Sequence, residues 1–376
     1  MRVLVTDGED RAALAAARGL WRSGHNVAVA AGVRRAATHV SRACSERFVV
    51  PRSLAGPDFV AALAAVAERR NVDVLLPASD AALLALSHRR HQLPRPLLEW
   101  LPPHETVARA LQKWALLEPA ARAGFAVPET ESCADAHDAH ATAARFGFPV
   151  VVKPNISVVQ ARREAARVAV DRAALDKALP ALGTPVLVQR FYRRSAVVAL
   201  AGVVWNGRLR AVVAARWSRR WPPADGAAAF AETIAPARKL VEQTEELLNA
   251  IGWHGIFELE LLELEAGTFA PVDLNPRPFG WMALALRAGA NLPAVWAECV
   301  AGAEPARVVA RAGVRYRWED ADLKHLVWQA RRRHVRAAAA VLRPHRRVAH
   351  AWFELRDPLP LGAAFVRSGR QLTRRG

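Results

Sequence analysis

Short apolar runs alternate with helix-forming segments over the first hundred residues. Strand-like runs stand at 2–6, 26–30 and 72–76, and Ala/Leu-rich helical segments follow the first run to Leu20 and occupy 58–70. Strands that alternate with helices of this length predict a parallel sheet with helical crossovers. Ligands bind at the carboxyl ends of strands in such sheets, where Asp7 and Asp80 fall. No G-x-G-x-x-G follows the first run, so a dinucleotide site is not predicted.

The middle of the chain has a different pattern of predicted strands and helices. Four prolines between Pro94 and Pro103 predict a boundary, and a helix is expected from Thr106 to Ala123. Beyond it, apolar β runs outnumber helices, which predicts an α+β arrangement with much antiparallel sheet. The expected strands are 149–154, 185–191, 197–204, 209–215, 255–264 and 269–274.

The last part of the chain is rich in arginine, with a helical stretch around 322–342. The sequence therefore predicts three parts. An N-terminal α/β domain covers 1–103, a second domain covers 104–304, and a basic helical C-terminal extension covers 305–376.

Composition and charge limit the classes of function. The chain has 53 Lys and Arg against 35 Asp and Glu, a formal charge of +18, and more than half of the excess lies in 305–376. No apolar run approaches the roughly 20 residues of a membrane span, and the short apolar start predicts a strand rather than a signal peptide. The three cysteines have no metal-type spacing, which is typical of a reducing, cytoplasmic environment.

The segment from Gly255 to Gly280 predicts a β-hairpin that turns near Gly267. Because side chains alternate along a strand, Asp273 and Asn275 point the same way, and Glu260 on the first strand could face them. Two carboxylates and an amide oxygen form a hard site that suits Mg²⁺. The alternative is a charged, solvent-facing hairpin, which Glu263 and Glu265 resemble.

Three further segments are ambiguous when taken one at a time. Lys153 ends the apolar run FPVVVKP, and its side chain could point into a cleft or simply into solvent. The same two alternatives hold for Lys113. The run VLVQRF at 186–191 could border a ligand with its backbone or could be an ordinary buried strand.

Taken together, these motifs resemble the ATP-grasp superfamily. Their order is K-x-x-L, G-x-x-V-P-x-T, FPVVVKP, VLVQRF and the hairpin with DLNPR, and the likeness extends to VLLPASD near residue 80. The branch that they resemble most includes the large chain of carbamoyl phosphate synthase and the carboxylate–amine ligases. The resemblance implies a Rossmann-like pre-ATP-grasp domain, followed by an ATP-grasp domain, and it leaves the C-terminal extension unassigned.

The resemblance also implies roles for individual residues. Lys113 and Lys153 would contact the phosphates of ATP, and Val188, Gln189, Arg190 and Phe191 would border the adenine. Glu260, Asp273 and Asn275 would hold Mg²⁺, with Mn²⁺ as an alternative. Lys153 and Arg277 would act in catalysis, with Arg277 on the γ-phosphate or an acyl phosphate. Arg216, Arg219 and Arg220 could reach a substrate carboxylate or could be solvated surface side chains.

Three positions depart from the pattern of the superfamily. Arg190 and Asp273 stand where glutamate is common, and the stretch after Lys153 has no glycine, where relatives use a glycine-rich loop over the phosphates. Arg162 and Arg163 are the candidates to clamp the phosphates in its place.

The function that follows is a cytoplasmic, ATP-dependent carboxylate–amine ligase that acts through an acyl phosphate and releases ADP and phosphate. Its partners would be a small carboxylate and an amine, and homo-oligomer formation is left open. Two alternatives remain: a catalytically silent nucleotide-binding sensor or scaffold, and a nucleic-acid-associated protein. The sequence does not favour the last one, because no recognised nucleic-acid motif or aromatic-interleaved basic run is present.

Overall fold

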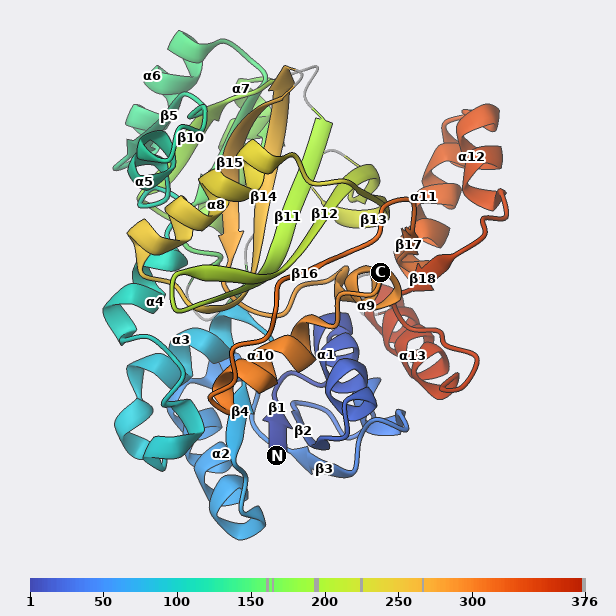
Figure 1. The fold of residues 1–376 in the computed structure, drawn as a ribbon. Coiled ribbons are helices and arrows are strands. Elements are labelled where there is room, and N and C mark those ends of the chain that lie inside the picture. The colour runs from blue at the N-terminus through green and yellow to red at the C-terminus, as the bar shows by residue number, and fades with distance from the viewer. Residues whose placement is uncertain (160–161, 164–165, 193–195, 224–225, 266, 374–376) are drawn as a thin grey trace.

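Four parallel strands form the first sheet, in the order β3-β2-β1-β4, at the bottom of the computed structural model in Figure 1. The structure describes residues 1–159, 162–163, 166–192, 196–223, 226–265 and 267–373. The strands are β1 (Arg2–Val5), β2 (Asn26–Ala31), β3 (Glu46–Val49) and β4 (Val74–Leu76), and the flanking helices are α1 (Arg11–Arg22), α2 (Pro57–Arg70) and α3 (Asp80–His88). The predicted parallel sheet is confirmed. Strand β3 escaped prediction because its side chains alternate between exposed and half-buried.

The link to the next sheet differs from the expected single helix at 106–123. Two short helices, α4 (His104–Ala110) and α5 (Leu117–Arg122), are separated by a turn. Pro119 explains the break, because a proline fits the first turn of α5 but not the interior of a continuous helix. The turn is held by Asn155, whose backbone and side-chain oxygens accept from the amides of Lys113 and Trp114 at 2.9 Å each. Short 3-10 helices precede it: η1 (Thr38–Val40), η2 (Ser53–Ala55), η3 (Arg90–Gln92) and η4 (Arg95–Leu98).

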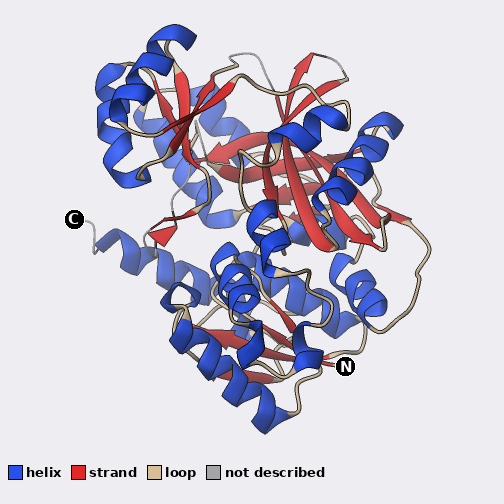
Figure 2. Ribbon diagram, turned by 90° about the vertical axis from the view of Figure 1, so that its left-hand side faces the viewer, coloured by secondary structure: helices blue, strands red, loops and turns tan. Residues whose placement is uncertain are grey.

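A small antiparallel sheet with its own apolar core follows, in the order β5-β10-β6-β9. Figure 2 shows it with its helices at the upper left, apart from the first sheet at the bottom. Its elements are β5 (Thr130–Cys133), α6 (Ala136–Phe146), β6 (Val150–Pro154), β9 (Arg167–Ala169), α7 (Arg172–Leu182) and β10 (Val186–Arg190). A two-stranded ribbon, β7 (Val158–Val159) with β8 (Arg162–Arg163), extends from the end of β6.

The largest sheet has the order β15-β14-β11-β12-β13-β17-β18, with β16 beside β12. Its strands are β11 (Ala196–Trp205), β12 (Arg208–Trp221), β13 (Ala227–Ile234), β14 (Gly255–Glu265), β15 (Thr268–Asn275), β16 (Val308–Val309), β17 (Arg315–Arg317) and β18 (Val348–His350). Helices α8 (Arg238–Ile251), α9 (Met282–Arg287) and α10 (Leu292–Val300) accompany it. The antiparallel middle of the chain is confirmed, and Gly267 makes the hairpin turn with a φ of +81°.

The basic segment from residue 305 contributes strands as well as helices. Strands β16, β17 and β18 extend the large sheet, and α11 (Glu319–Arg331) and α12 (Val335–Leu342) replace the single helical stretch expected at 322–342. Arg333 takes a positive φ of +59° at the turn that separates them. The chain continues into α13 (Leu359–Thr373), which lies near α1 and the first sheet in Figure 1.

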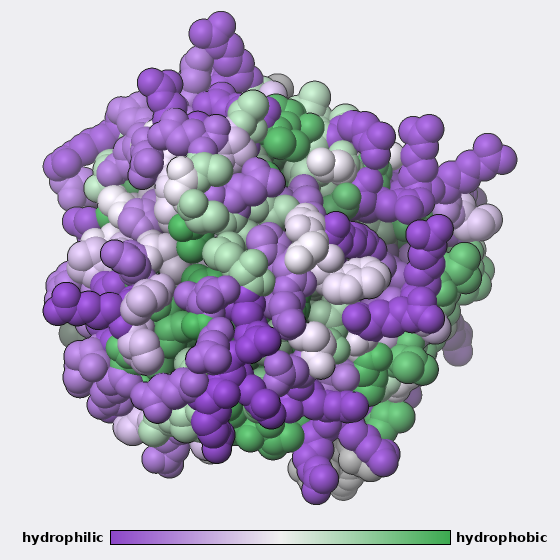
Figure 3. Space-filling view, turned by 60° about the horizontal axis from the view of Figure 1, so that its bottom comes forward, coloured by the Kyte–Doolittle hydropathy of each residue, from purple (hydrophilic) through white to green (hydrophobic). Residues whose placement is uncertain are grey.

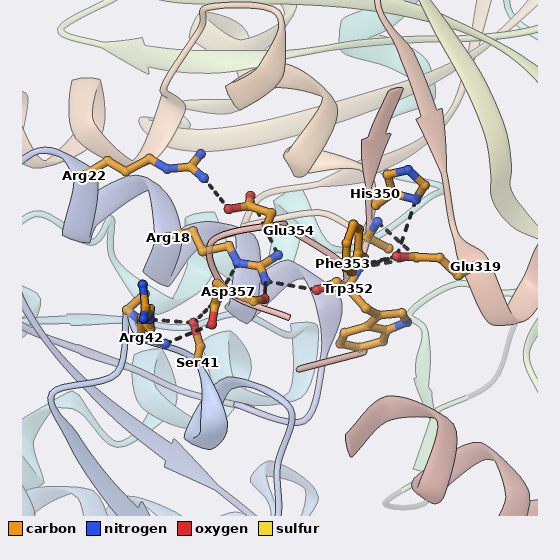
Figure 4. A network of polar contacts seen from close by, with 12 residues as sticks. Arg18, Arg22, Ser41, Arg42, Glu319, His350, Trp352, Phe353, Glu354 and Asp357 are labelled. Carbon is orange, nitrogen blue, oxygen red and sulfur yellow. Dashed lines mark hydrogen bonds and ion pairs between the residues drawn. The ribbon is translucent and has the colours of Figure 1, made fainter. Parts of the chain in front are cut away.

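A buried ion pair fastens this C-terminal segment to α1 (Figure 4). Arg18 is only 2% exposed, and it donates to the Asp357 carboxylate and to the Trp352 carbonyl at 2.9 Å each. Asp357 also accepts from the Ser41 hydroxyl at 2.6 Å and from the Arg42 amide at 3.0 Å. Every charged atom of Asp357 therefore has a partner, and the end of the chain is part of the packed structure.

None of the helices in the described residues has the length and apolar character to cross a membrane. The face shown in Figure 3 is mainly hydrophilic, with small apolar patches between the polar side chains.

We expect no salt-steep binding of nucleic acid by the basic segment. Arg331, Arg332 and Arg333 are exposed at the end of α11, and Arg332 stacks on Trp328 at 4.4 Å rather than standing in an extended basic groove. Non-specific phosphate contacts would lose about 10³–10⁵ in affinity between 50 and 200 mM salt. A gel shift at low salt that vanishes over this range, and that the triple change to glutamine removes, would contradict the expectation. Deleting the segment is unsuitable, because its strands belong to the large sheet.

Candidate active site

A cavity of about 320 Å³ lies between the small sheet and the large sheet. Its walls come from β6, β9 and β10 on one side and from β11, β12, β14 and β15 on the other. Apolar side chains such as Val151, Leu262 and Val272 line part of it. The predicted site residues that line it are Lys113, Lys153, Gln189, Arg190, Phe191, Glu260, Asp273 and Asn275.

The β14–β15 hairpin brings the oxygen donors together. Its register places Glu260 opposite Asp273 and Glu258 opposite Asn275. The Asn275 amide nitrogen donates to both glutamates at 3.2 Å, and its side-chain oxygen accepts from Arg277 at 2.7 Å. The alternation of side chains along the two strands therefore gathers three carboxylates and one amide at one edge of the cavity.

This cluster of carboxylates is crowded. Burial, together with the neighbouring charges of Glu258 and Asp273, raises the pKa of Glu260 well above its usual range. Burial raises the pKa of Glu258 to about 7, against the hydrogen bond from the Trp281 indole and the charge of Arg277. A divalent cation would relieve this repulsion, so the donor set fits Mg²⁺. No group of three or more His, Cys, Asp or Glu in the described residues forms a metal cage alone, so phosphate oxygens would complete the coordination.

Two lysines reach the same edge from different elements. Lys113, in the turn between α4 and α5, lies 3.0 Å from the Asp273 carboxylate and 3.0 Å from the Ser157 hydroxyl. Lys153, at the end of β6, donates to the Val272 carbonyl at 3.0 Å and is only 5% exposed. Burial and the nearby Lys113 lower the pKa of Lys153 to about 8. The strand-end lysine thus points into the cavity rather than into solvent, and it stays mostly protonated at neutral pH.

Arg277 stands behind the hairpin and connects it to the first sheet. Its guanidinium donates to both carboxylate oxygens of Asp80, at 2.6 and 3.1 Å. Burial works against the charged form, but Asp80 prevails and raises the pKa of Arg277 above its usual range. Arg277 does not line the nucleotide-sized cavity itself. Its two partners Asp80 and Asn275 do.

Only the end of the predicted adenine strand borders the cavity. Val188 is fully buried and pairs with Glu131 on one side and Val152 on the other, so it does not line the cavity. The cavity is bordered by the residues at the end of the strand. Gln189 carries a buried amide nitrogen without a partner in the described residues, and the indole nitrogen of Trp217 in the same wall is in the same state. Both are donors available to a bound ligand.

The arginines behave differently from one another. Arg216 pairs with Glu263 at 2.7 Å, and Nε and Nη2 of Arg219 each donate to Asp322 at 2.8 Å, and neither arginine lines the cavity. Arg220 lines the cavity. Arg190 pairs with Glu129 at 2.9 Å. Arg162 and Arg163 form β8, but their side chains lie outside the described residues, and the predicted clamp stays a prediction.

No protein-family model and no curated protein sequence matches the chain. Solved structures do resemble it. N5-carboxyaminoimidazole synthetase from Staphylococcus aureus, complexed with ADP, is 14% identical, has a TM-score of 0.64, and covers 81% of this chain and 79% of its own. A biotin carboxylase–β-γ-ATP complex from Campylobacter jejuni is 16% identical, with a TM-score of 0.64 and coverage of 84% and 74%.

A third solved structure, the L-amino acid ligase from Bacillus licheniformis, is 14% identical, with a TM-score of 0.59 and coverage of 80% and 73%. The chain has the ATP-grasp fold. In this ATP-grasp fold the cavity between the small and large sheets is where the predicted nucleotide and metal residues gather.

Two residues of this ATP-grasp site were missed by sequence reasoning. Glu258 is two residues before Glu260 on the same strand, so the period of two that placed Asp273 beside Asn275 also placed it in the cluster. Asp80 was noticed only as a strand-end residue. Its pairing with Arg277 joins positions 197 residues apart, and no local pattern indicates such a contact.

Proposed function

We propose that the protein is an ATP-dependent ligase that joins a small carboxylate to an amine, releasing ADP and phosphate. The observation that carries the proposal is the convergence of Lys113, Lys153, Glu260, Asp273 and Asn275 on one cavity. Unpartnered donors of Gln189 and Trp217 in its wall support a nucleotide ligand. The complexes of two similar structures with ADP and with an ATP analogue support it further.

The reaction consists of two transfers. A substrate carboxylate oxygen attacks the γ-phosphorus of ATP and ADP leaves, which gives an acyl phosphate. The amine nitrogen then attacks the acyl carbon, loses a proton, and phosphate leaves. The protein stabilises negative charge that develops on the transferring group. Lys113 and Lys153 supply cations at the hairpin edge, and Arg277, held in place by Asp80 and Asn275, supplies a third beside it.

Glu260, Asp273 and Asn275 would hold Mg²⁺, which when bound neutralises phosphate charge and orients the phosphates. The chain's own residues prepare this site, because Asn275 is fixed between Arg277 and the two glutamates. Lys113 shares Asp273 with the predicted ion, so the lysine compensates the carboxylate before nucleotide binds.

We expect nucleotide binding to depend on magnesium and on the hairpin. Asp273→Ala and Asn275→Ala should each weaken MgATP binding at least tenfold, because each removes an oxygen donor, about 1.4 kcal/mol or more. Calorimetry with and without EDTA measures this. Glu265→Ala, on the exposed end of the same hairpin, is the matched control. Equal affinity in wild type and both variants, with or without metal, would refute the metal site.

The deciding experiment for the activity is ADP release against pooled small carboxylic acids and amines, amino acids included. We expect a pool of acid plus amine to stimulate ADP release and neither class alone to do so fully. Arg190 and the glycine-free stretch after Lys153 depart from the superfamily pattern, and they favour the alternative of a catalytically silent nucleotide binder. If MgATP binds in calorimetry but no pool elicits ADP, the silent nucleotide binder is the better description.

A further inference from the structure

A second cavity, of about 280 Å³, has Arg277 in its wall. Arg277 lines this second cavity, whereas its partners Asp80 and Asn275 line the first. The hydrogen-bonded group of Arg277, Asp80 and Asn275 therefore contributes to the walls of both cavities. A molecule in the second cavity would lie next to the group that we assign to the transferring phosphate.

The wall of the second cavity is assembled from distant parts of the chain. The segment between β1 and α1 supplies Glu9, Asp10 and Arg11, and the exit of the hairpin supplies Arg277. The C-terminal segment supplies most of the rest, including Trp318 and Lys324. The basic extension, which the resemblance leaves unassigned, thus completes a cavity beside the proposed active site.

Several polar groups of this wall are already satisfied within the protein. Asp320 accepts from the Trp352 indole at 3.0 Å and from the Ser368 hydroxyl at 3.1 Å. Arg367 donates to the backbone oxygen of Glu9. Arg11 donates to the Gly280 carbonyl at 3.0 Å and stacks on the Trp318 ring at 3.5 Å. These contacts fix the shape of the cavity.

Other groups of the same wall can still form hydrogen bonds with a ligand. They include one carboxylate and one ammonium group. Asp10 stands at the N-cap of α1, but its carboxylate makes no capping hydrogen bond. Within the described residues, the Lys324 ammonium has one polar contact, a long one of 3.5 Å to Asp320. The indole nitrogen of Trp318 is buried and has no partner in the described residues. A carboxylate and two donors thus remain available to a ligand.

We infer that this cavity binds a small substrate that carries both an ammonium and a carboxylate group, the chemistry of an amino acid. Asp10 pairs with the ammonium, and Lys324 with the Trp318 indole binds the carboxylate. The volume lies just below the about 300–1,000 Å³ of most ligand pockets, which fits a molecule of this size. The inference rests on the proposed ligase function, for which this molecule is one of the two joined substrates.

A neighbouring groove differs from this cavity in the charges of its lining residues. It shares Ala363 and Arg367 with the cavity, but its cations are Arg34, Arg35, Arg47, Arg52 and Arg367, and no carboxylate is among its described lining residues. Such a groove offers no described carboxylate to an ammonium group. The paired signs of charge in the cavity favour a zwitterion instead.

The test measures binding without nucleotide, so that its outcome is independent of ATP. Tryptophan fluorescence and calorimetry follow titration with each of the twenty common amino acids, with its N-acetyl derivative and with its amide. Trp318 and Trp352 line the cavity and report its occupancy. We expect at least one amino acid to bind, and both of its singly charged derivatives to bind at least tenfold more weakly.

Two variants assign the two ends of the ligand. Asp10→Asn should weaken the amino acid about tenfold and leave its N-acetyl derivative unchanged, whereas Lys324→Met should weaken the amino acid and leave its amide unchanged, since each variant removes one charge pair. Lys177→Met, on the exposed face of α7, is the control. Both variants should unfold much as wild type does, because Asp10 makes no capping hydrogen bond and the contact of Lys324 with Asp320 is long, at 3.5 Å.

Three results would overturn the inference: no binding by any amino acid, equal binding of the singly charged derivatives, or unchanged affinity in both variants. A different result would contradict the proposed ligase function. That result is the absence of magnesium-dependent ATP binding or of ADP release, measured on the same preparation.

Discussion

Lys153→Met is expected to lower kcat for ADP release by about 10²–10³, the usual cost of removing one preorganised charge from a transition state. Methionine keeps the length and apolar stem of the side chain, so the buried end of β6 stays filled. Lys153 is buried against the Val272 carbonyl, so a truncation to alanine would leave a cavity as well as remove the charge.

The measurement is steady-state ADP release with a substrate pair found in the pooled assay, together with calorimetry of MgATP. Lys177→Met serves as the control, because this lysine is exposed on α7. Circular dichroism and thermal unfolding should show a native fold for both proteins. A folded Lys153→Met variant that turns over at the wild-type rate would show that the strand-end lysine has no part in phosphate chemistry.

Asp80→Asn is expected to destabilise the protein by about 3–5 kcal/mol, because it removes the one carboxylate that is hydrogen-bonded to the buried guanidinium of Arg277 in the described residues. Both side chains are less than a tenth exposed and share two hydrogen bonds. Urea unfolding monitored by tryptophan fluorescence gives the change. Asp58→Asn, exposed in the first turn of α2, should cost less than about 1 kcal/mol.

The double variant Asp80→Asn/Arg277→Met separates charge from packing. Because it removes both partners, it should recover much of the lost free energy of unfolding while activity stays low. A single Asp80→Asn variant as stable and as active as wild type would refute the idea that this pair sets the position of Arg277.

The sequence predicted the parallel sheet, the antiparallel middle and most of the proposed site, because periodicity and local motifs carried that information. Asp273 and Asn275 were placed together by the period of two in a strand. Periodicity and local motifs do not indicate contacts between segments that are far apart in the sequence. The packing of the first sheet against the hairpin and the C-terminal segment pairs Asp80 with Arg277 and places Asp10 and Lys324 in the wall of one cavity.

The predicted helix boundaries were wrong where a tertiary contact overrode the local preference for helix. The segment 106–123 has good helix formers, yet the amides of Lys113 and Trp114 bond to Asn155 instead of continuing the helix. Pro119 was a local sign of the break. The contact with Asn155 is what places Lys113 at the metal edge, so the interruption of the helix is part of the site.

The ion pair between Arg18 and Asp357 has a consequence for the timing of synthesis. The two residues are 339 positions apart, so at about 5–20 residues per second the ribosome needs roughly 20–70 s to make the second after the first. During that interval α1 has its sheet to pack on but no counter-charge for Arg18. The nascent N-terminal part is therefore the stretch on which a chaperone would find the longest-lived unfinished surface of this protein.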